Sequence, residues 1–338
     1  MEAQATPRRP RSGIIRAIAV LLVLIMLLLS VLMWWWDTEP RLFDPVKVTQ
    51  TGMQEMQRPV SVGDTTTVTL ITSVETLLDK RGGYLSNDKL PPGVLMDNLP
   101  NWEFGSLTAS RDLVRALRND FSRSQTQSTE DKDLAEADPL LNSPNDRWLL
   151  PSSESQYRKA VKHLDGYLKR LGDTEDSSAH FYARADNLAD YLQLASSRLG
   201  SLSQRLSASV GQVRIGDVDG PANAGTVSGA PAGARMVKTP WLKIDDNFYE
   251  ARGYTWTLLE QLKAIQHDFG PILRSKHADV SLQQVIRELE DAQRPLSSPM
   301  VLNGSPFGFF ANHSLVMANY VSRANAAIID LRELLKRG

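Results

Sequence analysis

The chain of 338 residues contains no cysteine. This absence excludes a disulfide scaffold, a metal site with cysteine ligands and a thiol nucleophile. The five histidines show none of the spacings that zinc sites use, such as His-Glu-x-x-His. The sequence also contains neither a complete phosphate-binding loop nor a nucleophile elbow. We therefore predict no metal, no cofactor and no catalytic residue.

Net charge is small as well. The whole chain carries a formal charge of −1, and residues 1–36 hold four arginines and one glutamate, which leaves −4 for the rest. Proteins that bind nucleic acid show clustered basic surfaces, and a mildly acidic domain offers none. We expect no nucleic-acid partner.

The most prominent feature of the sequence is a run of twenty consecutive residues without a charge, residues 17–36. A helix of this length is about 30 Å long, which matches the hydrocarbon core of a bilayer. Tryptophan side chains favour the headgroup level, and the run ends in three of them: Trp34, Trp35 and Trp36. The run predicts a transmembrane helix, with the lipid bilayer as its partner.

Basic residues precede this run, in a tail formed by residues 1–16: Arg8, Arg9, Arg11 and Arg16. Positive charge beside a first span stays in the cytoplasm, so the N-terminus is expected inside and the rest of the chain outside. A cleaved signal peptide is the alternative. The run is longer than a signal core of about 7–15 residues and no small-x-small site precedes the tryptophans, which favours an uncleaved signal anchor.

The exported part divides by composition. Residues 37–63 contain prolines and glycines without a helical period and are expected to form an extended tether. Residues 64–210 and 241–338 show helical periods and are interpreted as two parts of one bundle. Between them, residues 211–240 are rich in Gly, Ala and Pro, and such a segment buries too little to order itself. We expect this segment to be flexible.

The clearest helical pattern lies in residues 181–206, where apolar residues alternate in steps of four and three. This spacing is typical of helices packed at the coiled-coil angle. A similar run over 157–171 precedes it, and the short connection predicts that the two helices are antiparallel neighbours. Further runs cover 251–269, 282–292 and 317–335. The fold is therefore predicted to be all-α, a bundle of long antiparallel helices with loop-rich segments.

Polar and aromatic residues are densest in and after a predicted loop over 83–106, which we expect to be followed by a helix from Ser106 to Ser124. Trp and Arg dominate binding hot spots, so this set is a candidate cleft or partner surface. An internal polar network that holds the loop to the bundle is the alternative. The candidate binding residues are Asp97, Asn98, Trp102, Glu103, Arg111 and Asp112.

Several runs of sequence are similar to a known family: LLDKRGGYLSND (77–88), DNLPNWEFG (97–105), FSRSQTQSTED (121–131), FYARADNL (181–188) and RLGSLSQRLSASVG (198–211). They resemble the bacterial family catalogued as domain of unknown function 2333. The resemblance covers nearly the whole chain. It implies a single-span protein of the inner membrane of Gram-negative bacteria, with its C-terminal part in the periplasm, and it brings no activity and no catalytic residue.

Three functions stay open at this point. The missing catalytic motifs and the helical periods favour a non-catalytic scaffold or adaptor for envelope proteins, either as a single chain or as a homo-oligomer. The second hypothesis is a ligand sensor that binds near Trp102. The third is a cell-wall hydrolase that uses Asp97, Glu103 or Asp112 as its carboxylates.

Overall fold

A computed structural model describes residues 11–124, 129–173, 178–215, 225–226, 234–298, 300–306 and 308–337. Within them the fold is all-α, as predicted. The α-helices are α1 (Arg11–Trp36), α2 (Pro45–Glu55), α3 (Asp64–Asp79), α4 (Asn98–Ala116), α5 (Lys132–Leu141), α6 (Ser153–Leu171), α7 (Ala185–Ser207), α8 (Ile244–Asp268), α9 (Gly270–Ser275), α10 (Asp279–Ala292) and α11 (His313–Lys336). Short 3-10 turns lie at Gly93–Leu95, Ala208–Val210 and Trp241–Lys243, and one π-helical turn at Leu117–Phe121.

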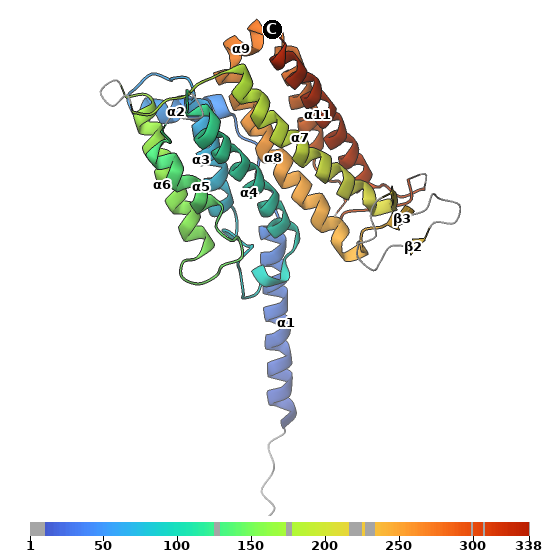
Figure 1. Cartoon of the computed structure of the whole chain (residues 1–338). Coiled ribbons are helices and arrows are strands. Elements are labelled where there is room, and N and C mark those ends of the chain that lie inside the picture. Colours follow the sequence, from blue (N-terminus) through green and yellow to red (C-terminus); the bar gives the residue numbers. More distant parts are fainter. Residues whose placement is uncertain are drawn as a thin grey trace, which may run out of the picture.

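Helix α8 is the centre of the body. Its residues from Ala251 to Leu262 are buried on every side, because α4 crosses one face while α3 and α10 cover others. Helices α5 and α6 extend the layer beside α3 and α4, and α7 and α11 form the opposite layer (Figure 1). One connected hydrophobic core runs through both layers.

Two glycines allow α4 and α8 to cross in backbone contact. A Cβ atom on Gly253 would lie 1.8 Å from the carbonyl oxygen of Trp102, and one on Gly105 would lie 2.0 Å from that of Glu250. Beside this crossing, the Ser106 Oγ and a threonine hydroxyl of α8 are hydrogen bonded at 2.5 Å. Side chains larger than these would force the two helices apart.

The helical runs predicted from the sequence are confirmed, since their apolar residues form buried stripes. In α7 the stripe consists of Leu188, Leu192, Ala195, Leu199, Leu202 and Leu206. Its partner, however, is α11, whereas α6 packs against α3 and α5. The prediction that α6 and α7 are neighbours was wrong. The connection crosses the body instead, with the backbone N–H of Tyr182 bonded to the carbonyl of Phe121 and Phe181 packed on Phe269.

Two element boundaries also differ from expectation. Helix α4 begins at Asn98, so the loop before it is shorter than predicted and Trp102 is helical. Residues 37–63 are not extended throughout, because they contain α2. The Asp44 side chain caps that helix by accepting from two backbone N–H groups at 3.1 and 3.2 Å, and Pro45 occupies its first position.

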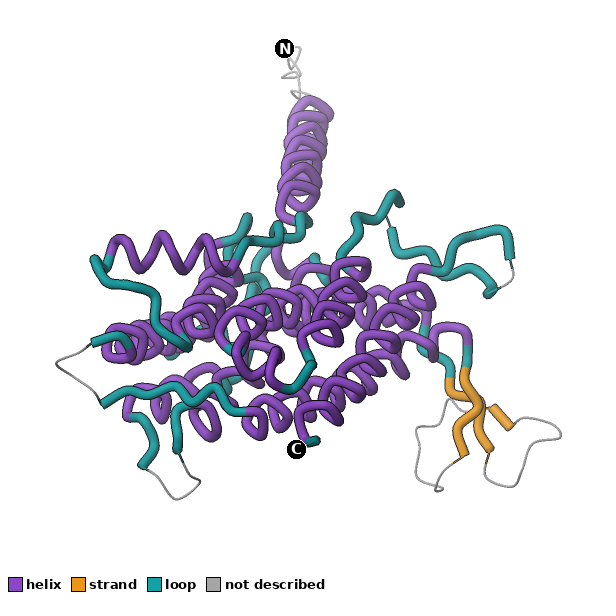
Figure 2. The backbone as a smooth tube through the Cα atoms, turned by 90° about the horizontal axis from the view of Figure 1, so that it is seen from above, coloured by secondary structure: helices purple, strands orange, loops and turns teal. Residues whose placement is uncertain are grey.

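A small sheet projects from the body between α7 and α8 (Figures 1 and 2). Strands β1 (Gln212–Ile215) and β3 (Ala234–Val237) are antiparallel, with Gln212 opposite Val237, and β2 (Gly225–Thr226) pairs with the other edge of β3. Composition did not indicate these strands. Most of the segment predicted to be flexible, residues 216–224 and 227–233, lies outside the described residues, so its flexibility stays a prediction.

The body has two distinct ends. At one end, the ends of α3, α7 and α10 lie beside the starts of α4, α6, α8 and α11. Contacts such as Lys80 with Glu103 and Arg205 with Glu250 join them. We call this the anchor end, because α1 leaves the body there (Figure 1). At the opposite, far end, Thr66 at the start of α3 contacts Asp268 at the end of α8.

Candidate functional site: the joint between the apolar helix and the body

Within the described residues, one helix is long and apolar enough to cross a membrane, Gly13–Trp36, and its most apolar stretch is not buried by the rest of the chain. Such a helix is either a membrane anchor or a signal sequence. Of the predicted anchoring arginines, Arg11 begins α1 and Arg16 is exposed on it. Arg8 and Arg9 lie outside the described residues.

The three tryptophans at the end of α1 have different surroundings. Trp34 is 79% exposed, whereas the guanidinium of Arg81 lies 5.9 Å from the ring centre of Trp35. Trp36 packs on the hydrophobic core and lies against Gly82, where a Cβ atom would be 2.8 Å from the indole. Gly82 has a φ of +81°, which also favours glycine at this position. The last turn of α1 is thereby fixed to the loop that follows α3.

An ion pair then binds the chain three residues further on. The guanidinium of Arg252 contacts both carboxylate oxygens of Glu39, at 2.5–3.0 Å. Arg252 is only 5% exposed, and its remaining N–H groups donate to the carbonyls of Ala292 at 3.1 Å and Arg294 at 2.9 Å. A buried charge is tolerated when it is paired and its donors are satisfied, as here. One side chain of α8 therefore links the segment that follows α1 to the end of α10.

A third contact involves a buried carboxyl group. Glu260 of α8 accepts a hydrogen bond from the backbone N–H of Phe43 at 3.3 Å. The Phe43 ring packs edge-on against Trp256, with centroids 5.8 Å apart, and Trp256 packs in the same way on Trp102 at 5.2 Å. Burial raises the pKa of Glu260 from its ordinary value to about 7. This group therefore changes charge close to neutral pH.

We call this set of contacts the joint. It also includes a hydrogen bond of 3.2 Å from the Asn98 amide to Asp37. Its residues on the connecting chain are Trp36, Asp37, Glu39 and Phe43, and its partners on the body are Arg81, Gly82, Asn98, Trp102, Arg252, Trp256 and Glu260. Because Asp37, Glu39 and Phe43 each contact the body, the segment between α1 and α2 is bound to the body and is not a free tether.

Among the six predicted site residues, Asn98 and Trp102 thus belong to the joint, and the others point elsewhere. Glu103 is fully buried and its carboxylate accepts from Leu85 N and Ser86 N at 2.8 Å each, and from Ser86 Oγ at 2.5 Å. It also forms an ion pair with Lys80. Glu103 therefore holds the loop between α3 and α4 in place.

The side chains of the remaining three residues lie in different parts of the body. The guanidinium of Arg111 donates to the carbonyls of Leu141 and Ser143, both at 2.7 Å, and so holds the end of α5. Asp112 pairs with Arg198 of α7 at 3.0 Å, and burial raises its pKa although Arg198 opposes this effect. Asp97 is exposed before the first turn of α4. The six residues do not converge on one cleft, which agrees with the alternative of an internal polar network.

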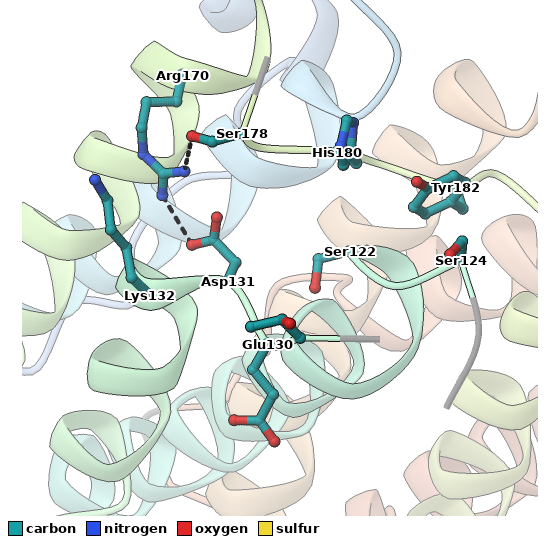
Figure 3. A pocket seen from close by; sticks show the side chains of 10 residues that line it. Ser122, Ser124, Glu130, Asp131, Lys132, Arg170, Ser178, His180 and Tyr182 are labelled. Atoms are coloured by element: carbon teal, nitrogen blue, oxygen red, sulfur yellow. Dashed lines mark hydrogen bonds and ion pairs between the residues drawn. The ribbon is translucent and has the colours of Figure 1, made fainter. Parts of the chain in front are cut away.

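The far end carries a polar pocket of about 420 Å³ (Figure 3). Arg170 lines this pocket. Its guanidinium contacts Asp131 at 2.8 Å, Asp133 at 2.6 Å and the Ser178 hydroxyl at 3.0 Å. Two carboxylates thus neutralise the cation, and a ligand anion would have to displace them. Among the described residues, no group of three His, Asp or Glu side chains is placed to hold a metal.

Comparison with known families gives one assignment. The family model described as an uncharacterized protein conserved in bacteria, DUF2333, matches residues 9–338. The chain belongs to this family. The match includes the whole of α1 as well as the body. No curated protein and no solved structure matches the chain significantly.

Sequence patterns did not indicate Glu39, Arg252 or Glu260 as residues of a site. Glu39 lies just beyond the tryptophans, where an acidic residue is expected at the end of an apolar run. The two α8 residues stand in a stretch with few other charges that is buried all round. A charged residue inside such a stretch requires a partner. The presence of Arg252 and Glu260 there is therefore the sequence feature that could have indicated the joint.

Proposed function

We propose that this chain is a signal-anchored, single-pass protein of the bacterial inner membrane, with a cytoplasmic N-terminus and a periplasmic body. The body acts as a non-catalytic scaffold or adaptor for other envelope proteins. The observation that carries the proposal is the joint, in which Glu39 and Arg252 hold the body to the end of α1. A domain fixed in this way keeps one orientation relative to the membrane and therefore presents the same surfaces to its partners.

An anchor is favoured over a cleaved signal for two reasons. The family match begins at residue 9, so the apolar helix is part of what the family shares. The helix also runs without interruption into the joint, where Trp36 packs on the core. A segment that is removed on export has no need of such packing.

The other two functions receive less support. Trp102 is fully buried, with its ring packed on Trp256, and therefore offers no face to a ligand. Glu103 and Asp112 are held by Lys80 and Arg198, respectively, in different parts of the body. A hydrolase needs two carboxylates that face one cleft with a free sugar site between them.

Reporter fusions test the topology. A phosphatase that is active only outside the cytoplasm, fused after residue 338, is expected to be active, whereas the same reporter fused before residue 1 is expected to be inactive. The opposite pattern, or release of the body from the membrane fraction by processing, contradicts the proposed anchor.

Site-specific photocrosslinking in living cells tests the scaffold. A photoreactive residue placed at exposed Asn119 or Arg287 is expected to give adducts with envelope proteins. Arg252→Ala is expected to change the adduct pattern by loosening the joint, while Arg294→Ala, which removes a side chain that is 72% exposed, leaves it unchanged. A chain without adducts that is also monomeric in mild detergent contradicts the scaffold. Adducts with only a second copy indicate a homo-oligomer instead of an adaptor.

A further inference from the structure

The loops at the anchor end expose large apolar side chains to solvent. They connect α3 to α4, α5 to α6, α7 to α8, and α10 to α11. Leu150 is 96% exposed and Phe309 is 98% exposed. The others, each about half exposed or more, are Leu90, Val94, Leu95, Trp148, Leu149, Trp241, Leu242, Met300 and Phe310.

The far end differs in both number and kind. In the described parts of the loops there, the large apolar side chains classed as exposed are Met56, Val60 and Val62, with no Trp or Phe among them. Single exposed apolar residues are normal on a protein surface, but a group of this size confined to one end marks a contact site. The exposed aromatic residues of the body loops therefore gather where α1 leaves.

The joint decides what this end faces. Glu39 is bound to Arg252, and Trp36 to the loop after α3, so the body cannot swing away from the axis of α1 without breaking these contacts. In Figure 1, the loop before α6 and the turn before α4 lie close to the level of the upper end of α1. A bilayer that contains α1 therefore reaches the same level as these loops.

We propose that the anchor-end loops insert their apolar side chains into the interface of the same bilayer that α1 crosses, so that the body lies on the membrane. This inference rests on the proposed anchor. Trp and Phe favour the interfacial region, and apolar side chains at the tips of loops gain from leaving water for the headgroup and acyl boundary. The occupant is lipid because these loops lie at the end of the body from which the apolar helix leaves.

The chain contains no cysteine, which permits a direct test with single labels. We place an environment-sensitive fluorophore in the full-length chain at Leu150→Cys or Phe309→Cys, with Val62→Cys at the far end as the matched exposed control and Leu27→Cys as the label inside α1. Each protein is reconstituted into phosphatidylethanolamine–phosphatidylglycerol vesicles with a spin-labelled quenching lipid. Emission from positions 150 and 309 is expected to shift to the blue and to be quenched at least threefold more strongly than emission from position 62.

The outcomes separate this inference from the proposed anchor. If position 27 is quenched but positions 150 and 309 behave like position 62, the anchor holds and the insertion of the loops is wrong. The same result would assign the loops to a protein partner, since the vesicles contain only lipid. If position 27 is not quenched either, both proposals are wrong. Both loop side chains are almost fully exposed, so their replacement is not expected to disturb folding.

Discussion

The two ends of the body both contain buried, paired charges, but their loops expose different numbers of large apolar side chains. At the anchor end, charges such as Arg252 and Glu103 are buried and paired, while Trp, Leu and Phe residues lie at the surface. At the far end, the surface pocket is lined by polar groups, and the ion pair of Arg58 with Asp64, at 2.7 Å, joins α3 to the end of α6. This difference in exposed apolar side chains supports the proposed contact of the anchor end with lipid.

The largest effect is expected where α4 and α8 cross within the half of the body that holds the joint. Gly253→Ala would bring a methyl group within 1.8 Å of the Trp102 carbonyl oxygen, which forces the two backbones apart. We expect a loss of about 3 kcal/mol or more in the free energy of unfolding, measured by thermal unfolding in detergent. Gly200→Ala in α7, where the nearest atom is 3.6 Å away, is the control and is expected to be neutral or slightly stabilising. Equal losses in both variants would contradict this packing.

An effect of similar size is expected from the loss of the ion pair in the joint. Arg252→Ala leaves the carboxylate of Glu39 and two carbonyls without their donor, and is expected to lower the free energy of unfolding by about 3–5 kcal/mol. Arg294→Ala, at an exposed pair with Asp291, is expected to change it by about 1 kcal/mol or less. Chemical denaturation of the three proteins measures both values. An Arg252 variant as stable as the Arg294 variant would show that the joint contributes nothing.

The third prediction concerns pH. Burial raises the pKa of Glu260 to about 7, so the folded protein retains a proton that the unfolded chain loses near pH 4.5. The free energy of unfolding should therefore fall by about 3 kcal/mol as the pH rises from about 4.5 to 7. Glu260→Gln should remove this decline and be more stable than the wild type above pH 7. A variant with the same pH profile as the wild type would contradict the assignment.

At the far end the sign is reversed. Burial by itself would raise the pKa of Asp133, but contacts with Arg170 and His163 outweigh burial and lower it. Its contribution to stability is therefore present above its ordinary pKa and is lost as the pH falls through the lowered value. Asp133→Asn is expected to destabilise the protein at pH 7 and to have less effect at pH 3, as followed by thermal unfolding. A larger loss at pH 3 than at pH 7 would refute this.

The smallest effect on stability is expected at the exposed loops. Leu150→Asp and Phe309→Asp should change the free energy of unfolding in detergent by about 0.5 kcal/mol or less, as should Val62→Asp at the far end. In vesicles the two loop variants, but not Val62→Asp, should leave the anchor-end loops more accessible to protease. Equal accessibility in all three would remove the functional difference between the two ends.

Sequence periodicity predicted the long helices well, because helices such as α7 bury one stripe of apolar residues, which includes Leu188 and Leu199. It did not predict which helices pack together, since a leucine stripe does not specify its partner. The joint was out of reach for a similar reason: Glu39 and Arg252 are 213 residues apart in the chain. The start of α4 was missed because Asn98 and Pro100 were interpreted as loop residues, although proline is also common in a first helical turn.

For the six candidate site residues, the sequence left open whether they form a binding surface or an internal polar network. Glu103 and Arg111 form hydrogen bonds between different elements of the fold. Their partners are mainly backbone groups such as Leu85 N and Leu141 O. Backbone partners leave no signature in the sequence. The sequence therefore could not decide between the two, while the contacts of Glu103 and Arg111 agree with the internal polar network.

The central claim is that the body is held in a fixed orientation relative to α1. A distance measurement between α1 and the far end tests this claim. Spin labels at Leu27→Cys and Val62→Cys in the full-length chain, reconstituted in lipid nanodiscs, report this distance by pulsed electron spin resonance. The account predicts one narrow distance distribution, which broadens when Arg252→Ala is added. A broad distribution in the otherwise unaltered chain, as a free tether after Trp36 would give, contradicts it.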